Sequence, residues 1–513
     1  MRIGIDVGGT NTDSVLMDGT RLIRKFKTPT TADITGGIQT ALNALLTSSA
    51  EELTVDAVMV GTTHFTNALL QRRDLAVTGI LRLCLPATDM LPPMVDWPEE
   101  LRTSIQGHTH LLEGGLEFDG REISPIHESQ IRDIARRMAN EGVEAVAISG
   151  VFSSVDPTQE QIAAKIVAQE APHVRVSVSH EIGRVGLLER ENATILNACL
   201  SRVSESAVGA FKLAIEDSGL SSSLFLSQND GTLMDAEYAT KYPVLAISSG
   251  PTNSMRGAFF LTGIHDAVVA DIGGTSTDVG ILKSGFPRES SIAVDIGGVR
   301  TNFRMPDVLS IPLGGGSLVR TSPLVIGPES VGRRLMDESL VFGGSVMTTT
   351  DVAVAAGMAD IGQKPLVSKI RPADVDEALK VMHEMAEEAI DRLKFNSDDI
   401  PLVLVGGGHF LINDQITGAS EVIRPENGEI ANAIGAAIAQ IGGQSESIFS
   451  LNEMSREEAI SLATREATTR AVSAGADPGS ISIVDIEEIP LTYLPSNAIR
   501  IRIKVVGSIP EVT

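Results

Sequence analysis

Two nearly identical octapeptides carry the residue types that could do chemistry in this chain. They read DVGGTNTD at residues 6–13 and DIGGTSTD at residues 271–278. In both copies, β-favouring residues lead into the glycines and a second apolar run follows, which predicts a β-hairpin with a glycine-rich tip. Adjacent glycines let backbone amides approach an anion closely, and the threonine hydroxyl adds a donor. One such loop is commonly an ordinary turn, but two copies predict the two halves of a phosphate clamp.

The aspartates of the octapeptides divide into two pairs. Asp6 and Asp271 stand at predicted strand ends, where a carboxylate can hold a hydrated Mg²⁺ or accept a proton from a nucleophile. We therefore predict that these two residues are the catalytic pair and also the metal ligands. Asp13 and Asp278 are expected to hold the hairpins by side-chain-to-backbone hydrogen bonds. The residues predicted to bind phosphate are Gly8, Gly9, Thr10, Gly273, Gly274 and Thr275.

A third segment, VDIGGVRTNF at residues 294–303, looks similar but has lost the chemistry. Val299 stands in place of the threonine, and Asn302 stands in place of the second aspartate. The hydroxyl donor and one carboxylate are therefore missing. We expect a structural hairpin here.

Composition excludes several classes of function. The net charge of −25 over 513 residues repels nucleic-acid phosphate, so bound phosphate must be held locally by backbone amides and metal. The two cysteines, Cys84 and Cys199, form no CxxC motif, which argues against a disulfide framework, a zinc site or an iron–sulfur cluster. No apolar run reaches the length of a signal peptide or a membrane span. We expect a cytoplasmic protein without a membrane or nucleic-acid partner.

Strand and helix patterns alternate along the chain, which predicts α/β domains with parallel or mixed sheets. A first domain is expected at residues 1–199, with an insertion near 80–125 where a proline-rich stretch interrupts the pattern. A second domain is expected at residues 200–444. The tail at residues 445–513 reads as a helix followed by alternating segments, which predicts a small α+β appendage.

A phosphate hairpin in each of two α/β regions resembles the actin/Hsp70/sugar-kinase superfamily. The resemblance implies two duplicated ribonuclease H-like (actin-like ATPase) domains around a nucleotide cleft. It also implies an adenosine-contacting turn late in the second domain, and LVLVGGGHF at residues 402–410 supplies Gly406, Gly407 and Gly408 for it. The small residues of GEIANAIGAAIAQIGG (428–443) suit a helix that packs closely near a hinge.

Further stretches are similar to the hydantoinase A/oxoprolinase family. They include GTTHFTNALLQRRD (61–74), VSHEIGRVGLLERENATILNACL (178–200), SSGPTNSMRGA (248–258) and IPLGGGSLVR (311–320). The resemblance implies ATP-dependent opening of a cyclic amide or imide through phosphorylation of the amide oxygen, with ATP and Mg²⁺ bound. The substrate-side residues that it implies are Thr62, Thr63, His64, Asn67, Gly315, Gly316 and Ser317.

Two departures from the family leave the substrate open among hydantoins, oxoproline and other lactams. The segment after IGPESVG (326–332) lacks the family's Pro-Gly-Pro-Ala-Cys-Tyr stretch, and His64 stands where a small or aliphatic residue is expected. His64 is expected to orient substrate or to act as an acid or base near neutral pH, and the alternative is a loop histidine that makes one hydrogen bond. The alternative functions are a small-molecule kinase, a ketone-carboxylase-type subunit, and an ATP-driven reactivase or chaperone. A B-type hydantoinase subunit or a second copy of the chain is the expected partner.

Overall fold

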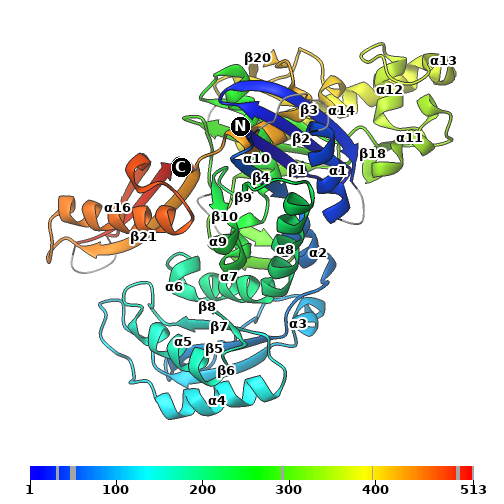
Figure 1. Ribbon diagram of the computed structural model, residues 1–513. Helices are drawn as coiled ribbons and strands as arrows, with labels where there is room; N and C mark the ends of the chain where they lie inside the picture. The colour runs from blue at the N-terminus through cyan, green and yellow to red at the C-terminus, as the bar shows by residue number, and fades with distance from the viewer. Residues whose placement is uncertain (31–33, 47–53, 291–293, 395–396, 493–496, 511–513) are drawn as a thin grey trace.

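The computed structural model describes the chain except for residues 31–33, 47–53, 291–293, 395–396, 493–496 and 511–513 (Figure 1). It is an α/β structure with two main sheets and a smaller inserted one, as the sequence predicts. No described helix has the length and apolar character needed to cross a membrane. The α-helices are α1 (Ile34–Leu46), α2 (His64–Gln71), α3 (Glu99–Ile105), α4 (Glu128–Asn140), α5 (Thr158–Glu170), α6 (Ser179–Ile182), α7 (Leu187–Cys199), α8 (Ser201–Asp217), α9 (Ala236–Lys241), α10 (Ser249–Thr262), α11 (Leu335–Glu338), α12 (Thr349–Ala355), α13 (Lys364–Val367), α14 (Pro372–Leu393), α15 (Ala431–Ile438) and α16 (Arg456–Ser473).

The first main sheet has nine strands in the order β22-β23-β21-β10-β9-β4-β1-β2-β3. Its centre is apolar on both faces, since residues of β1 and β4 belong to the largest hydrophobic cluster. The strands are β1 (Arg2–Val7), β2 (Asn11–Asp18), β3 (Arg21–Pro29), β4 (Ala57–Thr62), β9 (Ser223–Ser227), β10 (Leu233–Asp235), β21 (Ile441–Ser450), β22 (Ser482–Pro490) and β23 (Ala498–Gly507).

The second main sheet repeats the arrangement of the first around its own hairpin. In both sheets the opening strand pairs antiparallel with the next strand and parallel with a later one: β1 with β2 and β4, β11 with β12 and β19. The register places Asp6 opposite Asp13 and Asp271 opposite Asp278. Both predicted hairpins are therefore confirmed. The strands are β11 (Ala267–Ile272), β12 (Thr277–Lys283), β13 (Phe286–Pro287), β16 (Val308–Ile311), β19 (Ile400–Val405) and β20 (Ala419–Ile423).

The inserted sheet is larger than the sequence indicates. Its four strands run in the order β6-β5-β7-β8 and pair in parallel, and it occupies the lower part of Figure 1. The expected insertion near 80–125 includes only two of these strands. β7 pairs with β5 and β8 pairs with β7, so both belong to the inserted sheet and not to the first main sheet. The strands are β5 (Thr78–Leu85), β6 (His108–Glu113), β7 (Ala145–Gly150) and β8 (Arg175–Val178).

Strand pairing also differs from the domain boundaries expected at 199/200 and 444/445. β9 pairs in parallel with β4, so the chain after residue 200 first completes the first sheet. β21 then pairs with β10 and β23, so the strands of the tail extend that sheet. The sequence pattern does not indicate this pairing, because the free edge of β10 is paired by β21, a strand that lies far from it in the chain. Two short hairpins lie outside the main sheets: β14 (Val294–Ile296) with β15 (Val299–Thr301), and β17 (Ser317–Thr321) with β18 (Leu324–Ser330).

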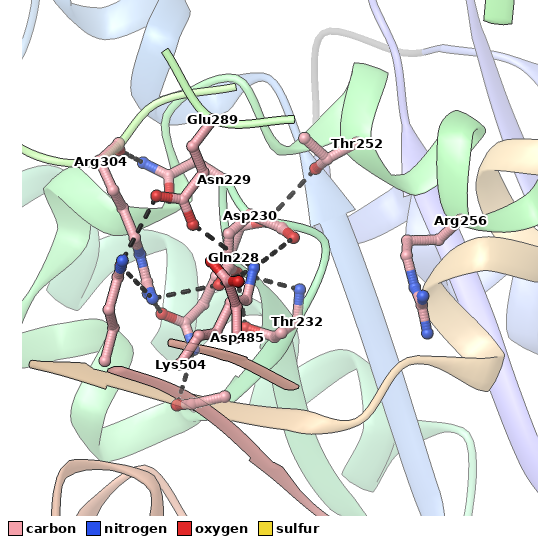
Figure 2. A network of polar contacts seen from close by, with 12 residues as sticks. Gln228, Asn229, Asp230, Thr232, Thr252, Arg256, Glu289, Arg304, Asp485 and Lys504 are labelled. Atoms are coloured by element: carbon pink, nitrogen blue, oxygen red, sulfur yellow. Dashed lines mark hydrogen bonds and ion pairs between the residues drawn. The ribbon is translucent and has the colours of Figure 1, made fainter. Parts of the chain in front are cut away.

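Buried charges fix the tail against the first sheet (Figure 2). Asp230 is 1% exposed. Its Oδ2 forms ion pairs with a guanidinium nitrogen of Arg304 at 3.1 Å and with Nζ of Lys504 in β23 at 3.0 Å. Burial raises the pKa of Asp230, but these two cations outweigh burial and hold the pKa well below its usual range. Glu289 pairs with the same lysine at 3.5 Å. Removing one partner would leave a buried charge uncompensated, so the network specifies how the tail docks.

Helices α10 and α15 cross at backbone contact between the two main sheets. A Cβ atom at Gly257 of α10 would overlap the carbonyl oxygen of Ala431, and one at Gly435 of α15 would overlap that of Asn253. On its other side α15 packs against β1, where a Cβ at Gly4 would overlap Ala433. The close-packing helix predicted from small residues is confirmed.

This crossing gives the first prediction. Gly257→Ala should lower the melting temperature by at least about 4 °C, because the added methyl group forces the helices apart at a cost of about 2 kcal/mol. Gly209→Ala on α8 is the matched control, since a Cβ there meets no atom within 4 Å. That control should leave stability unchanged or slightly higher. Equal melting temperatures for both variants by circular dichroism would contradict the close crossing.

Candidate functional site

A cavity of about 520 Å³ lies between the two glycine hairpins, and we call it the interdomain cavity. Both hairpin tips line it, and so does the late glycine triplet that follows β19. Residues distant in sequence therefore meet around one space, as the duplicated octapeptide predicts. The predicted site residues that line it are Asp6, Gly8, Gly9, Thr10, Thr63, Asp271, Gly273, Gly274, Thr275, Gly315, Gly406, Gly407 and Gly408.

Five of the predicted substrate-side residues do not line this cavity. Thr62 Oγ1 accepts a hydrogen bond from the backbone N–H of His64, and Asn67 Nδ2 donates to Thr63 Oγ1, so these side chains hold the start of α2. Burial lowers the pKa of His64. Ser317 Oγ bonds within its own loop and also donates to the carbonyl of Thr275, and Gly316 donates to the carbonyl of Gly274, so both residues support the second hairpin tip.

Each of the two leading aspartates sits against a glycine at the end of the neighbouring parallel strand, Gly61 within β4 and Gly406 directly after β19. A Cβ at Gly61 would overlap Asp6 Oδ1, and a Cβ at Gly406 would overlap Asp271 Oδ1. Gly406 also has φ +82°, a conformation that side chains disfavour. The glycines therefore create the room that the two carboxylates occupy.

Consecutive residues of α10 hold both carboxylates. Asn253 Nδ2 donates to Asp6 Oδ1 at 3.2 Å, and Ser254 Oγ donates to Asp271 Oδ2. Gly250 and Pro251, in the first turn of the same helix, line the interdomain cavity. One helix thus fixes the two halves of the site relative to each other. The sequence singled out SSGPTNSMRGA as a block without indicating these two contacts.

A chain of polar contacts extends from Asp6 to a lysine. Asn432 Nδ2 donates to Asp6 Oδ2 at 3.1 Å and to Asp13 Oδ2 at 2.9 Å, and Lys27 Nζ lies 2.8 Å from Asp13 Oδ1. All four residues line the cavity, and Lys27 is the one basic side chain among the described residues that do. No motif marks Lys27, which reaches the site because β3 pairs with β2.

The expectation that Asp13 and Asp278 hold their turns was wrong. Asp13 pairs with Lys27 and Asn432, whereas Asp278 accepts a hydrogen bond from Ser310 Oγ on β16. Both carboxylates line the interdomain cavity. The antiparallel register is the cause, since it turns each second aspartate toward the same side as the first.

Burial dominates the electrostatics of the site. Together with a smaller contribution from nearby carboxylates, burial raises the pKa of Asp6 to about 6 and that of Asp271 to about 7. Among the described residues no three acidic, histidine or cysteine side chains are grouped to hold a metal ion. Carboxylate oxygens still suit Mg²⁺, which commonly takes only one or two protein ligands together with water and phosphate oxygens.

The third glycine segment forms the hairpin β14–β15 away from this cavity, as expected. A Cβ at Gly298 would contact Pro98, and Asn302 Oδ1 accepts a hydrogen bond from the backbone N–H of Arg184. The asparagine that replaced the aspartate therefore joins this hairpin to the loop after α6.

The comparisons with known proteins agree with this geometry. The model of the hydantoinase/oxoprolinase N-terminal region matches residues 2–171, and the hydantoinase/oxoprolinase model matches residues 190–388. The chain belongs to the hydantoinase/oxoprolinase family. The caprolactamase subunit alpha of Pseudomonas jessenii is 29% identical over 394 residues, which cover 69% of this chain and 54% of the relative. The acetophenone carboxylase gamma subunit of Aromatoleum aromaticum is 27% identical over 390 residues, covering 69% of this chain and 53% of the relative.

This family member therefore matches about half the length of these relatives. Structural similarity to solved proteins covers more of the chain than sequence similarity does. The structure of ATP-dependent caprolactamase from Pseudomonas jessenii superposes with a TM-score of 0.80 at 21% identity, covering 100% of this chain and 89% of that one. A nucleotide-free acetone carboxylase gives 0.70 at 17% identity, with coverage of 100% and 88%. The α/β fold with a glycine hairpin in each of two duplicated sheets, which the sequence predicts, is therefore confirmed.

The raised pKa of Asp271 predicts how stability depends on pH. The folded state keeps a proton on this carboxyl up to about pH 7, whereas the unfolded state releases it near the ordinary aspartate pKa of 3.8. Stability should therefore fall as pH rises from about 4 to about 7. Asp271→Asn, measured without nucleotide or metal, should gain at least about 1 kcal/mol relative to the parent between pH 5 and pH 8.

The control for this measurement is Asp217→Asn at the exposed end of α8. It should keep the parent's dependence of unfolding free energy on pH. If Asp271→Asn follows the parent curve at every pH, then Asp271 is not held as a protonated acid in the folded protein.

Proposed function

We propose that this chain binds ATP in the interdomain cavity and uses it to phosphorylate the carbonyl oxygen of a cyclic amide or imide. The observation that carries the proposal is the pair of glycine hairpins facing each other across one cavity, with an aspartate of raised pKa beside each tip. Relatives named caprolactamase and 5-oxoprolinase support the choice of a cyclic amide. Hydantoins, oxoproline and other lactams all present the same carbonyl group.

In this proposal the triphosphate lies between Gly8–Thr10 and Gly273–Thr275, and the adenosine lies near Gly406–Gly408. Glycine tips support this placement because their amides can approach phosphate oxygens without a side chain in between. At Gly9 a Cβ would meet no atom within 4 Å, so the space above that tip is open. Lys27 supplies a local positive charge in a chain whose net charge is −25.

Asp6 and Asp271 are the residues that we assign to chemistry. Their raised pKa values let them accept a proton near neutral pH, which suits a general base better than an ordinary aspartate. They are also the residues that we propose to hold Mg²⁺, which would neutralise phosphate charge when bound. Asn253, Ser254 and Asn432 orient the carboxylates by the hydrogen bonds described above.

The proposed reaction starts with attack of the amide oxygen on the γ-phosphorus, which breaks the bond to the β–γ bridging oxygen and releases ADP. Water then adds to the ring carbon as a carboxylate takes its proton. The ring C–N bond breaks with protonation of nitrogen and leaves an acyl phosphate, from which a second water displaces phosphate. An unactivated amide resists hydrolysis. Phosphorylation makes its oxygen part of a good leaving group, and this explains the need for ATP.

A second candidate function begins with the same phosphorylation step, but carboxylation follows it in place of hydrolysis. Relatives also include the acetophenone carboxylase gamma subunit and the acetone carboxylase beta subunit of Xanthobacter autotrophicus. A ketone phosphorylated on its enol oxygen could be carboxylated in place of hydrolysis. Because these relatives and the caprolactamase are named as subunits, we propose that a partner subunit carries the step after phosphorylation.

The first test is ADP release with candidate acceptors. We expect hydantoin, 5-oxoproline or caprolactam to raise ADP release at least about tenfold over basal hydrolysis, since an acceptor oxygen in line with the γ-phosphate speeds transfer. Acetophenone with bicarbonate is the parallel arm for carboxylation. A stable phosphorylated product would indicate a kinase, and stimulation by a protein alone would indicate a reactivase.

The second test separates binding from chemistry at the aspartates. Asp6→Asn and Asp271→Asn should each keep ATP affinity within about tenfold of the parent, while turnover falls at least about a hundredfold. Asp295→Asn is the matched control, because Asp295 leads the third hairpin and is exposed. It should keep full turnover. Normal turnover in both cavity variants would remove these carboxylates from the mechanism.

A further inference from the structure

The turns that follow β4 and β19 are a second internal repeat of this chain. They read VGTTHF at residues 60–65 and VGGGHF at residues 405–410, so valine, the first glycine, histidine and phenylalanine recur. The two middle residues are threonines in the first copy and glycines in the second. The duplication seen in the hairpins therefore extends to the strand that pairs in parallel with each opening strand.

The two copies of this turn have equivalent places beside the leading aspartates. In each copy the first glycine lies against a carboxylate: a Cβ at Gly61 would overlap Asp6 Oδ1, and a Cβ at Gly406 would overlap Asp271 Oδ1. The first copy belongs to the first main sheet and the second copy to the second main sheet. The two turns therefore reach the interdomain cavity from its two opposite sheets.

The copies differ in the path of the backbone and in the residues that line the cavity. Gly406 has φ +82°, so the second turn leaves its strand at once. Gly407 lines the cavity, and a Cβ there would meet no atom within 4 Å. The first copy leads directly into α2, and Thr63, the residue before this helix, lines the cavity. The second turn thus offers bare backbone to a ligand, whereas the first offers a threonine.

The first turn of α10 lies beside the first copy. Ser248, the residue before α10, donates its backbone N–H to Thr66 Oγ1 of α2 at 3.3 Å. Gly250 and Pro251 of α10 line the interdomain cavity, and a Cβ at Gly250 would meet no atom within 4 Å. Open space therefore borders the start of α10, just as it borders Gly407 in the second copy.

Phosphoryl transfer requires its two reactants on opposite sides of the phosphorus that moves. The attacking and leaving oxygens lie roughly in line, and the attacking atom must be held about 3–3.5 Å from the phosphorus. The proposed function assigns adenosine to residues 406–408 of the second copy and the triphosphate to the hairpin tips. The molecule that receives the phosphoryl group must then approach from the first main sheet, where the other copy of the turn lies.

We propose that Thr63, Gly250 and Pro251 form the subsite for the phosphoryl acceptor, opposite the duplicated turn that takes adenosine. This inference rests on the proposed function and deepens it, because it names the residues that hold the cyclic amide. None of the three residues is charged, and an amide needs no counter-ion. The internal duplication thus divides the interdomain cavity into an acceptor half and a nucleotide half.

Single cysteines at the two open glycines test this division. The native Cys84 and Cys199 are buried, so iodoacetamide should react with the introduced thiol. In Gly250→Cys, at least one of hydantoin, 5-oxoproline and caprolactam, added at saturation with ADP and Mg²⁺, should slow alkylation at least about fivefold relative to ADP and Mg²⁺ alone. In Gly407→Cys, ADP and Mg²⁺ should give this protection without any cyclic amide.

Gly209→Cys on α8 is the matched control for both variants. A Cβ at Gly209 also meets no atom within 4 Å, and Gly209 does not line the cavity, so no ligand should change its alkylation rate. The acceptor subsite is overturned if none of the three cyclic amides protects Gly250→Cys, or if they protect Gly407→Cys in its place. The nucleotide proposal survives that result as long as ADP protects Gly407→Cys, and loss of the ADP protection overturns both.

A comparison of KM values tests the role of Thr63. Thr63→Val keeps the shape and removes the hydroxyl, so the KM of the cyclic amide that protects Gly250→Cys should rise at least about threefold. The KM of ATP should change less than about twofold. Thr63→Ser, which keeps the hydroxyl, should stay close to the parent, as should the control Thr469→Val on the exposed face of α16. An unchanged amide KM in Thr63→Val, or an equal rise in both KM values, would remove Thr63 from the subsite.

Discussion

The crossing of α10 over α15 is the contact on which the rest of this structure depends. At the crossing two glycines let the helix backbones touch, and α15 repeats this close approach against β1. The crossing brings Asn253 and Ser254 between the two hairpins, where each holds one aspartate. Bulkier residues at the crossing would move α10 away from α15 and β1, and the hydrogen bond from Asn253 to Asp6 would then be too long to form. The geometry of the interdomain cavity therefore follows from the packing of small residues outside it.

The second constraint is the cost of burying carboxylates. Four aspartates line the interdomain cavity, and burial raises the pKa of Asp6, Asp271 and Asp278. Structural ion pairs elsewhere in the chain behave in the opposite way: Asp230 is only 1% exposed, but its two cations lower its pKa. The direction of the pKa shift therefore distinguishes carboxylates whose charge is compensated by cations from carboxylates whose charge is not. Sites for chemistry commonly belong to the second kind.

The order of the strands explains how distant segments join. The first sheet takes strands from the start of the chain, from residues 223–235 and from the tail, and buried ion pairs of Lys504 hold the last of these in place (Figure 2). Helix α10 touches this joint too, because Thr252 Oγ1 donates to the carbonyl of Gln228 at 3.4 Å. Helix α10 therefore links the interdomain cavity to the joint between the first sheet and the tail.

The sequence by itself determined the local parts of this protein. The alternation of strands and helices, both glycine hairpins, the third hairpin and the small-residue helix all follow from short-range patterns of residues. The meeting of Asp6 with Asp271 could also be anticipated, because a duplicated motif suggests a duplicated domain. Tertiary structure alone decided the rest. Lys27 and Asn432 enter the site through strand pairing and helix packing, β7 and β8 join the insertion, and the tail completes the first sheet. These outcomes depend on contacts between residues far apart in the chain, where backbone edges and buried charges find partners that no local pattern specifies.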